Sequence, residues 1–455
     1  MKFQPLQAGI KLSMVLTLSL GITNCSVVDT LLESTFQPPL SESSPQPTNS
    51  PQVKDYRSFS DWCSSQKNLP LDSQKTVEIL LQVAGVNDCR LAENSLLEIS
   101  ELDLSRSEVK DLSPLITLPH VTRLNLSENQ ITDLTPLSTL TQLTRLNLSR
   151  NFIQDLSPLA ELPNLQILLL FKNEIEDITP LSTLSELTEL SLDGNLINDL
   201  TSLSDLPNLQ TLSLSENQIQ DGSVLANLEG LTQLSLNGNR ITDISFISEL
   251  QDLTQLNLRN NQIENIRSLS SLVDLKELNL DSNALADITP LSGLTQLETL
   301  SLSENQITDI QSLADLENLK TLQLRSNEIS DIKPLENLTN LAEDLNLIDN
   351  KISDIKPLSE LKNMTRLGLS KNEITDLKPL SDLTELVILY LDENKITDVK
   401  PLSTLTNLTE LNLWNNQIKT IDSLSPLEDL TYLGLQENPI EDKDCPIQPK
   451  SVCQF

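Results

Sequence analysis

Residues 143–159 read LTRLNLSRNFIQDLSPL, and the spacing of leucine, asparagine and proline in this stretch recurs along most of the 455-residue chain. The asparagine returns every 22 residues, with a single step of 23 residues between Asn327 and Asn350. It occupies the positions Asn129, Asn151, Asn173, Asn195, Asn217, Asn239, Asn261, Asn283, Asn305, Asn327, Asn350, Asn372, Asn394, Asn416 and Asn438. Ser107 takes its place in one earlier copy, so about sixteen repeats predict a solenoid of stacked units.

Each repeat begins with a short strand. In residues 124–126 leucine alternates with a polar residue, which predicts a strand with leucines inward and with Arg123, Asn125 and Ser127 outward. So short a strand is not stable alone, so we expect successive strands to pair into one parallel sheet that buries the leucines. The 23-residue step carries one extra residue in 341–345, which predicts either a β-bulge or a loop insertion.

The asparagine lies where the chain leaves the strand. Its amide offers donors and an acceptor, so we expect a buried asparagine ladder that satisfies backbone groups beyond the reach of the sheet. The following segment ends in Thr135-Pro136-Leu137, which predicts a 3₁₀ or helical turn with Thr135 as N-cap and Pro136 as first helical residue. We expect a looser turn where proline is missing, at Ser202, Val224, Phe246, Ser268, Ser312 and Ser423.

The pattern L-x-x-L-x-L-x-x-N-x-I-x-D-I-x-P-L resembles the 22-residue unit of internalin-type bacterial leucine-rich repeat proteins, and the match extends from Ile99 to Asn438. The resemblance implies an α/β solenoid, a leucine-rich repeat horseshoe with a parallel β-sheet on its concave face and short 3₁₀ or loop segments on its convex face. It also implies a recognition scaffold, and it leaves the partner open.

The first 54 residues differ in composition from the repeats. Lys2 and Lys11 flank the start of an apolar run over residues 12–22, which is too short to span a bilayer and is typical of a signal peptide over residues 1–25. Cys25 ends a segment that resembles the lipobox of bacterial lipoproteins, so the alternatives are lipidation of Cys25, ordinary cleavage with secretion, or an uncleaved anchor. Residues 26–54 are rich in Pro and Ser and predict a disordered linker.

The other four cysteines lie outside the repeats. They predict the disulfides Cys63–Cys89 and Cys445–Cys453, which form in an oxidising compartment such as the cell envelope. Metal binding is the competing interpretation, but the single histidine, His120, lies far along the chain from both pairs.

Both cysteine pairs belong to predicted end caps. Residues 72–85 have helical spacing, with Asp72 or Ser73 to begin the helix and Gly85 to end it. We therefore expect a helical N-terminal cap over residues 55–98, which covers the open leucine edge of the repeats at 99–438, and a C-terminal cap over residues 439–455.

The chain is strongly acidic, with a formal net charge of −34. This charge argues against nucleic acid as a partner, because phosphate would be repelled over most of the surface. Aspartate stands four residues after the repeat asparagine from Asp111 to Asp442, with Asn265 and Thr420 as exceptions. These carboxylates either accept local backbone N–H groups or bind Ca²⁺, and the presence of only one per repeat favours the first interpretation.

Binding specificity must lie in the outward positions, which are six, four and two residues before each asparagine and are mostly small or polar. Two clusters depart from this pattern, and neutral variation is the competing interpretation for both. The candidate protein-binding residues are Ile167, Leu169 and Phe171 in one repeat and Ile388, Tyr390, Trp414 and Tyr432 in three successive repeats. Arg123, Arg145 and Arg150 are expected on the same side near the start of the array.

The residue inventory argues against an enzyme, because one histidine and no free cysteine outside the caps provide no pair of nucleophile and base. No cofactor or metal is predicted. The leading hypothesis is an exported, monomeric scaffold that binds a protein or peptide on its concave face and contacts the membrane only through a lipid anchor. The alternatives are a structural cell-envelope component without a dedicated partner, and a protein similar to the cytosolic phosphatase regulators built on a 22-residue repeat.

Overall fold

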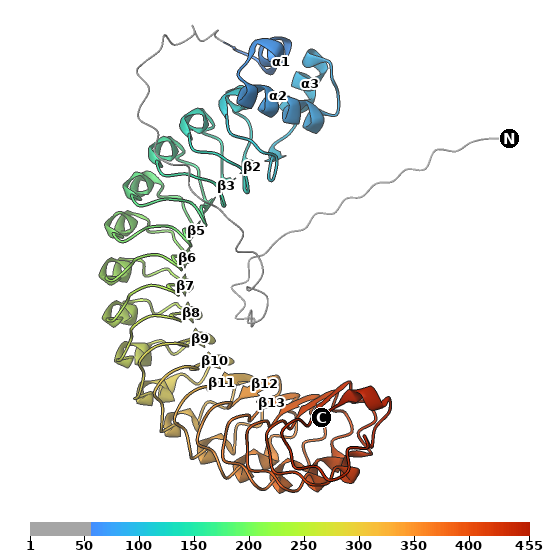
Figure 1. Ribbon diagram of the computed structural model, residues 1–455. Coiled ribbons are helices and arrows are strands. Elements are labelled where there is room, and N and C mark those ends of the chain that lie inside the picture. Colours follow the sequence, from blue (N-terminus) through green and yellow to red (C-terminus); the bar gives the residue numbers. More distant parts are fainter. Residues whose placement is uncertain (1–55) are drawn as a thin grey trace, which may run out of the picture. The chain divides into compact units, whose positions relative to one another are not determined.

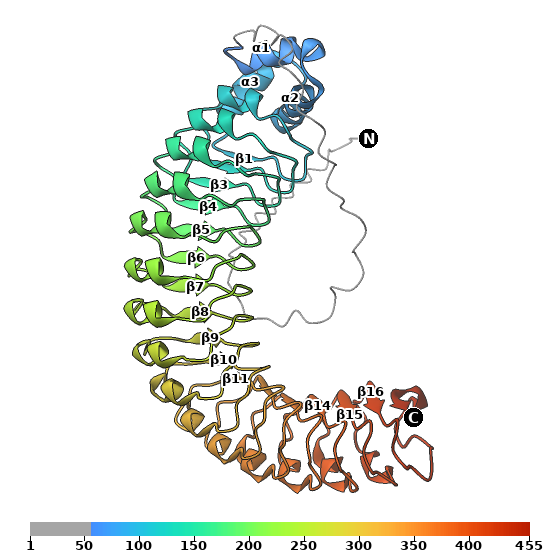
Figure 2. The same cartoon turned by 60° about the vertical axis from the view of Figure 1, so that its left-hand side comes forward.

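The computed structural model describes residues 56–455, so the predicted signal peptide, Cys25 and the linker lie outside the described residues. The described part begins with three α-helices and continues as a solenoid (Figure 1). Strands line the inner face of this stack, and 3₁₀ helices line its outer face (Figure 2). Within residues 56–455, no helix combines the length and the apolar character that a membrane span requires.

All strands belong to one parallel sheet, as the repeat pattern predicts. They are β1 (Glu101–Asp103), β2 (Arg123–Asn125), β3 (Arg145–Asn147), β4 (Ile167–Leu169), β5 (Glu189–Ser191), β6 (Thr211–Ser213), β7 (Gln233–Ser235), β8 (Gln255–Asn257), β9 (Glu277–Asn279), β10 (Thr299–Ser301), β11 (Thr321–Gln323), β12 (Asp344–Asn346), β13 (Arg366–Gly368), β14 (Ile388–Tyr390), β15 (Glu410–Asn412), β16 (Tyr432–Gly434) and β17 (Cys453–Gln454). Each strand pairs with the next in the sequence, and Leu124, Leu146 and Leu168 stand opposite one another in the register. These leucines are buried, so one continuous core runs through the stack.

A 3₁₀ helix follows each strand from β1 to β15 on the outer face. These helices are η2 (Ser113–Thr117), η3 (Thr135–Thr139), η4 (Ser157–Glu161), η5 (Thr179–Thr183), η6 (Thr201–Asp205), η7 (Ser223–Asn227), η8 (Ser245–Glu249), η9 (Arg267–Ser271), η10 (Thr289–Gly293), η11 (Gln311–Leu313), η12 (Lys333–Leu335), η13 (Lys356–Glu360), η14 (Lys378–Leu380), η15 (Lys400–Thr404) and η16 (Asp422–Leu424). A further one, η17 (Lys450–Val452), precedes β17.

Two details of the predicted turn are wrong. Thr135 is the first residue of η3 and does not cap it, because the carboxylate of Asp133 accepts its N–H group at 2.9 Å. Proline also does not control the length of the turn: η6 lacks proline and has five residues, whereas η12 contains proline and has three.

The predicted asparagine ladder is confirmed. Nδ2 of Asn129 donates to the carbonyl oxygens of Leu104 and Leu126, both at 2.9 Å, and its Oδ1 accepts the N–H group of Val109 at 2.9 Å. Each later asparagine repeats this arrangement, so every rung joins two successive repeats and satisfies backbone groups on both.

Three helices cap the start of the solenoid: α1 (Phe59–Ser64), α2 (Leu71–Ala84) and α3 (Cys89–Leu97), with the short η1 (Gln66–Asn68) between the first two. The predicted end of α2 is confirmed, since Gly85 takes the left-handed conformation with φ +70°. Its predicted start is wrong, because Pro70 occupies the N-cap position. The hydroxyl of Ser73 instead donates to the carboxylate of Asp111, which ties α2 to the first repeat.

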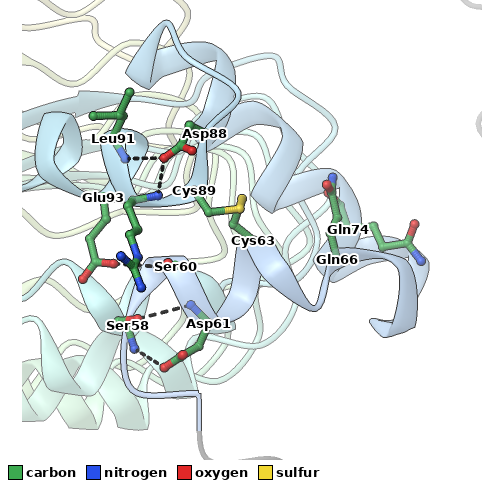
Figure 3. The surroundings of a disulfide bond; sticks show 11 residues. Ser58, Ser60, Asp61, Cys63, Gln66, Gln74, Asp88, Cys89, Leu91 and Glu93 are labelled. Atoms are coloured by element: carbon green, nitrogen blue, oxygen red, sulfur yellow. Dashed lines mark hydrogen bonds between the residues drawn. A yellow bond between two sulfur atoms is a disulfide. The ribbon is translucent and has the colours of Figure 1, made fainter.

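The Cys63–Cys89 disulfide joins α1 to the first turn of α3 (Figure 3). The N–H group of Ser60 donates to Glu93 at 3.1 Å and adds a second link between these helices. Trp62 is buried beside them. The cap therefore closes the leucine core at this end with one covalent and several polar contacts.

The far end of the sheet is covered by the chain terminus. Residues of β17 pair in parallel with β16, with Leu433 opposite Cys453, and the N–H group of Leu435 donates to the Gln454 carbonyl at 2.7 Å. The second predicted disulfide, Cys445–Cys453, is also present. It holds this last strand on the sheet, where an open edge would invite pairing with another chain.

The extra residue of the long repeat lies in the segment just before β12, where Glu343 forms a bend, and β12 keeps its full register with β11. Pairing between β12 and β13 starts only at Leu345 opposite Leu367. The hydroxyl of Thr365 donates to the carbonyl oxygens of Ala342 and Glu343, at 2.9 and 3.0 Å, and so satisfies the residues left out of the ladder. The stack changes direction between β11 and β14 (Figure 2).

Candidate binding surface

The concave face presents three outward positions in each repeat, which we call first, middle and last, at six, four and two residues before the asparagine. The middle position is less accessible than the sequence indicates. Ser213, Ser235, Asn279, Ser301 and Gln323 all occupy it and are buried. Neighbouring strands lie about 4.8 Å away on both sides, so side chains in the middle position are covered by one another and by those beside them.

This crowding divides the first candidate cluster, the N-terminal patch of Ile167, Leu169 and Phe171. Leu169 occupies a middle position between Asn147 and Ser191 and is only 4% exposed, so its predicted exposure is wrong. Ile167 and Phe171 remain half-buried. The guanidinium of Arg150 lies 5.4 Å from the centre of the Phe171 ring, so the chain itself already supplies a cation to this aromatic face.

The second cluster, the C-terminal patch, comprises Ile388, Tyr390, Trp414 and Tyr432. Strand register brings these residues together, because Ile388, Glu410 and Tyr432 occupy the first position on three adjacent strands. Tyr432 is 37% exposed, and the other three are half-buried. The two patches lie on β4 and β14 to β16, near opposite ends of the sheet.

Two glycines shape the C-terminal patch. Gly368 and Gly434 occupy middle positions on β13 and β16, on either side of Tyr390 and Asn412. A Cβ atom on Gly434 would lie 2.3 Å from Oδ1 of Asn412 and 2.9 Å from the Tyr432 hydroxyl, so the Tyr432 side chain extends over this glycine. A Cβ atom on Gly368 would lie 3.0 Å from the side chain of Ile348. The glycines thus make room for larger neighbours.

Carboxylates lie among the aromatic residues of this patch. Asp392 accepts hydrogen bonds from the Ser370 hydroxyl and from Nδ2 of Asn412, the latter at 2.9 Å. Burial raises the pKa of Tyr390 to about 12, and the adjacent Glu410 carboxylate adds to this shift. Tyr390 therefore keeps its hydroxyl proton at neutral pH and donates a hydrogen bond to Glu410.

Sequence reasoning missed Ile348, Glu410, Asp392 and the two strand glycines as members of this surface. A signal for the glycines was present, because the whole chain has only ten and a glycine inside a strand marks close approach of other groups. No comparable signal existed for the acids, since aspartate and glutamate are common throughout this chain.

The aspartates on the convex face cap turns, as the sequence favoured. From Asp111 to Asp398, each carboxylate accepts the N–H group two residues later, as Asp155 does from Ser157 at 2.8 Å. Hydrogen bonds from the hydroxyl and the N–H group of Ser157 hold the pKa of Asp155 below its usual range. In residues 56–455, no three acidic, histidine or cysteine side chains are grouped as metal ligands would be.

Comparison with family models identifies the class of protein. The model described as leucine-rich repeats (2 copies) matches residues 119–161, 207–249, 251–293, 273–315, 295–337 and 362–404. A second model, described as leucine-rich repeat, matches residues 384–440. These segments span more than half of the chain, which therefore belongs to the leucine-rich repeat family.

Solved structures place the chain within the internalin type of bacterial leucine-rich repeat proteins. An internalin, InlF, from Listeria monocytogenes is 29% identical, with a TM-score of 0.57, and the match covers 81% of this chain and 98% of that one. A leucine-rich repeat protein of Leptospira interrogans is 30% identical, with a TM-score of 0.72 and coverage of 79% and 96%.

A more distant structure shares the fold alone. The Arabidopsis receptor kinase HAESA, solved in complex with the peptide hormone IDA and the co-receptor SERK1, is 24% identical, with a TM-score of 0.60 and coverage of 75% and 70%. No curated protein matches this chain.

Proposed function

We propose that this protein is an exported, membrane-tethered scaffold that binds a protein or peptide through the C-terminal patch of its concave face. One observation carries the proposal: Tyr390 and Tyr432 lie on β14 and β16, and Trp414 directly follows the intervening β15, in a chain whose aromatic content is 3%. Aromatic side chains dominate the binding energy of protein interfaces. They are costly to leave in water without a use.

The composition of the face supports the same conclusion. Most outward positions elsewhere carry Ser, Thr, Asn or Gln, which solvate well and give little binding energy. The ladder and the leucine core hold the strands rigidly, so a partner would meet a preformed surface. A distant relative in fold, HAESA, is seen in complex with a peptide hormone, and the same scaffold therefore supports peptide binding in another protein.

The first test removes the exposed rings. In full-length protein, Trp414→Ala and Tyr432→Ala should each reduce capture of the partner about ten-fold or more, because a central aromatic contributes about 2 kcal/mol to binding. Capture is measured by cross-linking in envelope extract and quantitative mass spectrometry of the stoichiometric partner. The melting temperature should stay nearly constant.

Phe152→Ala is the matched control, since Phe152 is 42% exposed but lies outside the three outward positions. It should leave capture unchanged. Recovery of the protein with copies of itself alone would contradict the proposal and favour a structural role. A large fall in melting temperature for both patch variants would place these rings in the core instead.

The tether is tested separately, through residue Cys25. Cys25→Ser should release the protein from the membrane fraction, because a lipid can be attached only to the thiol. Fractionation followed by detection of the intact chain measures the effect. Continued membrane association of the Cys25→Ser protein would contradict lipid anchoring.

A further inference from the structure

Acidic side chains near the start of the sheet form ion pairs with arginine, whereas Asp392 at the C-terminal patch is bonded only by neutral donors. Near the start, Glu101 pairs with Arg123, and Glu128 pairs with Arg106 at 2.6 Å. At the C-terminal patch, Asp392 is hydrogen-bonded by the neutral donors Ser370 and Asn412. None of the ion pairs in the described part of the chain includes Asp392 or Glu410.

The aromatic rings show the same contrast. Phe171 of the N-terminal patch carries Arg150 over its face. In residues 56–455, no lysine or arginine lies over the ring of Tyr390, Trp414 or Tyr432. The C-terminal patch thus combines aromatic faces and carboxylates for which the chain provides no cation of its own.

The basic residues near the patch are already matched by acids. Burial raises the pKa of Asp344, and the nearby guanidinium of Arg366 opposes that shift, so Arg366 lies beside an acid. Lys371 lies 3.8 Å from Glu393. Arg366 also acts on Tyr390, but neither base forms an ion pair with Asp392 or Glu410. Glu410 is hydrogen-bonded by the neutral Tyr390 hydroxyl.

We propose that the C-terminal patch binds an extended segment of a partner protein, in which an arginine side chain pairs with Glu410 and stacks on Tyr432, while the residues beside this arginine contact Trp414 and Asp392. This proposal rests on the proposed function of the same surface. Tryptophan and tyrosine are the strongest aromatic partners of cations, and a planar guanidinium both stacks and bonds carboxylates bidentately. Lysine lacks this planar geometry, so the site should prefer arginine.

The strand geometry fits an extended segment. Glu410 stands between Ile388 and Tyr432 in the register, so a carboxylate is flanked by an aliphatic and an aromatic side chain. At middle positions Gly368 and Gly434 contribute no side chain of their own. A segment lying across the strands would meet the acid at the centre of this arrangement and apolar surface on both sides.

The test selects peptides on the full-length protein from a phage-displayed library of random dodecapeptides. Selected sequences should be enriched in arginine over lysine. Labelled synthetic copies should lose affinity about ten-fold or more, measured by fluorescence anisotropy, when the peptide arginine becomes lysine or when the protein carries Glu410→Gln or Trp414→Ala.

Glu189→Gln is the matched control, because Glu189 follows Ile167 in the register as Glu410 follows Ile388. It should leave binding unchanged. The inference would be overturned if arginine and lysine peptides bound equally well and if Trp414→Ala did not weaken either of them. Binding would then be due to the net charge alone. Selection of acidic peptides would also overturn it.

Two further outcomes separate this inference from the proposed function. Apolar peptides that lose binding in Trp414→Ala but not in Glu410→Gln would refute the arginine site and leave the patch as a binding surface. Arginine peptides whose binding is lost only in Phe171→Ala would refute both.

Discussion

Replacing Asn239 by alanine should lower the free energy of unfolding by about 2 kcal/mol or more. Nδ2 of Asn239 donates to the carbonyl oxygens of Leu214 and Leu236, both at 3.0 Å, and Oδ1 accepts the N–H group of Ile219 at 3.0 Å. The side chain is 7% exposed, so water does not readily replace it. The Ile219 N–H group would lose its partner, at a cost of about 1–3 kcal/mol. The two carbonyl oxygens would lose one of two donors, because Leu214 also accepts from Asn217 and Leu236 also accepts from Asn261.

Asn237→Ala provides the control for this prediction. Asn237 is two residues away, is half-buried on the concave face and should change stability by less than about 0.5 kcal/mol. Urea unfolding followed by circular dichroism measures the global effect. Hydrogen exchange at the Ile219 amide locates it, since this N–H group loses its acceptor. A loss below about 1 kcal/mol in Asn239→Ala would show that the ladder is not a major source of stability.

Asp281→Asn should stabilise the protein at neutral pH by about 2 kcal/mol. Asp281 lies in the last outward position after β9, and burial raises its pKa to about 6, against opposing contributions from the Ser303 N–H group and Arg259. The Ser303 N–H group donates to its Oδ1 at 2.7 Å, and an asparagine oxygen can accept the same bond. The substitution therefore removes a costly buried charge and retains the hydrogen bond.

The pH dependence of this gain follows from the direction of the shift. The folded pKa of about 6 lies above the ordinary value of 3.8, so at about pH 3 and below the carboxyl is mostly protonated in both states and its burial costs little. The cost develops as pH rises from 4 to 6 and is complete above that range. The advantage of Asp281→Asn in urea unfolding should therefore be full at pH 7 and nearly absent at about pH 3.

Asp193→Asn is the matched control for Asp281→Asn. Asp193 occupies the equivalent position four repeats earlier, and its carboxylate accepts hydrogen bonds from the hydroxyls of Ser191 and Ser213 and from the Ser215 N–H group. An amide in its place would lose one of the two hydroxyl donors. We expect little or no gain from this variant, and an equal gain in both variants would contradict the role assigned to the burial of Asp281.

Much of the fold follows from local spacing in the sequence. Three patterns each predict one role, and all three roles are found as expected. The alternation around Leu124 predicts a paired strand, the periodic asparagine predicts a buried ladder, and the aspartate four residues later predicts an acceptor for a turn N–H group. Details that depend on competition between neighbouring groups were not predictable. Thr135 becomes the first residue of the turn because the Asp133 carboxylate accepts the Thr135 N–H group, and the sequence pattern permits this start and one at Pro136 alike.

The candidate surface was predictable only in part, because exposure depends on the neighbours across strands. Leu169 and Tyr390 both occupy middle positions in the repeat pattern. Leu169 is buried between its neighbours, whereas Tyr390 is larger, lies next to Gly368 and stays half-buried. A count of positions within one repeat carries no information about the size of the side chain on the next strand.

The sequence by itself determined the repeating unit, its strand, its buried asparagine and the disulfides of both caps, since each of these depends on residue type at fixed spacing. The tertiary structure decided which outward residues form a surface and which acids within it lack a cation. Those properties arise from side chains about 22 residues apart that become neighbours only when the strands stack at about 4.8 Å.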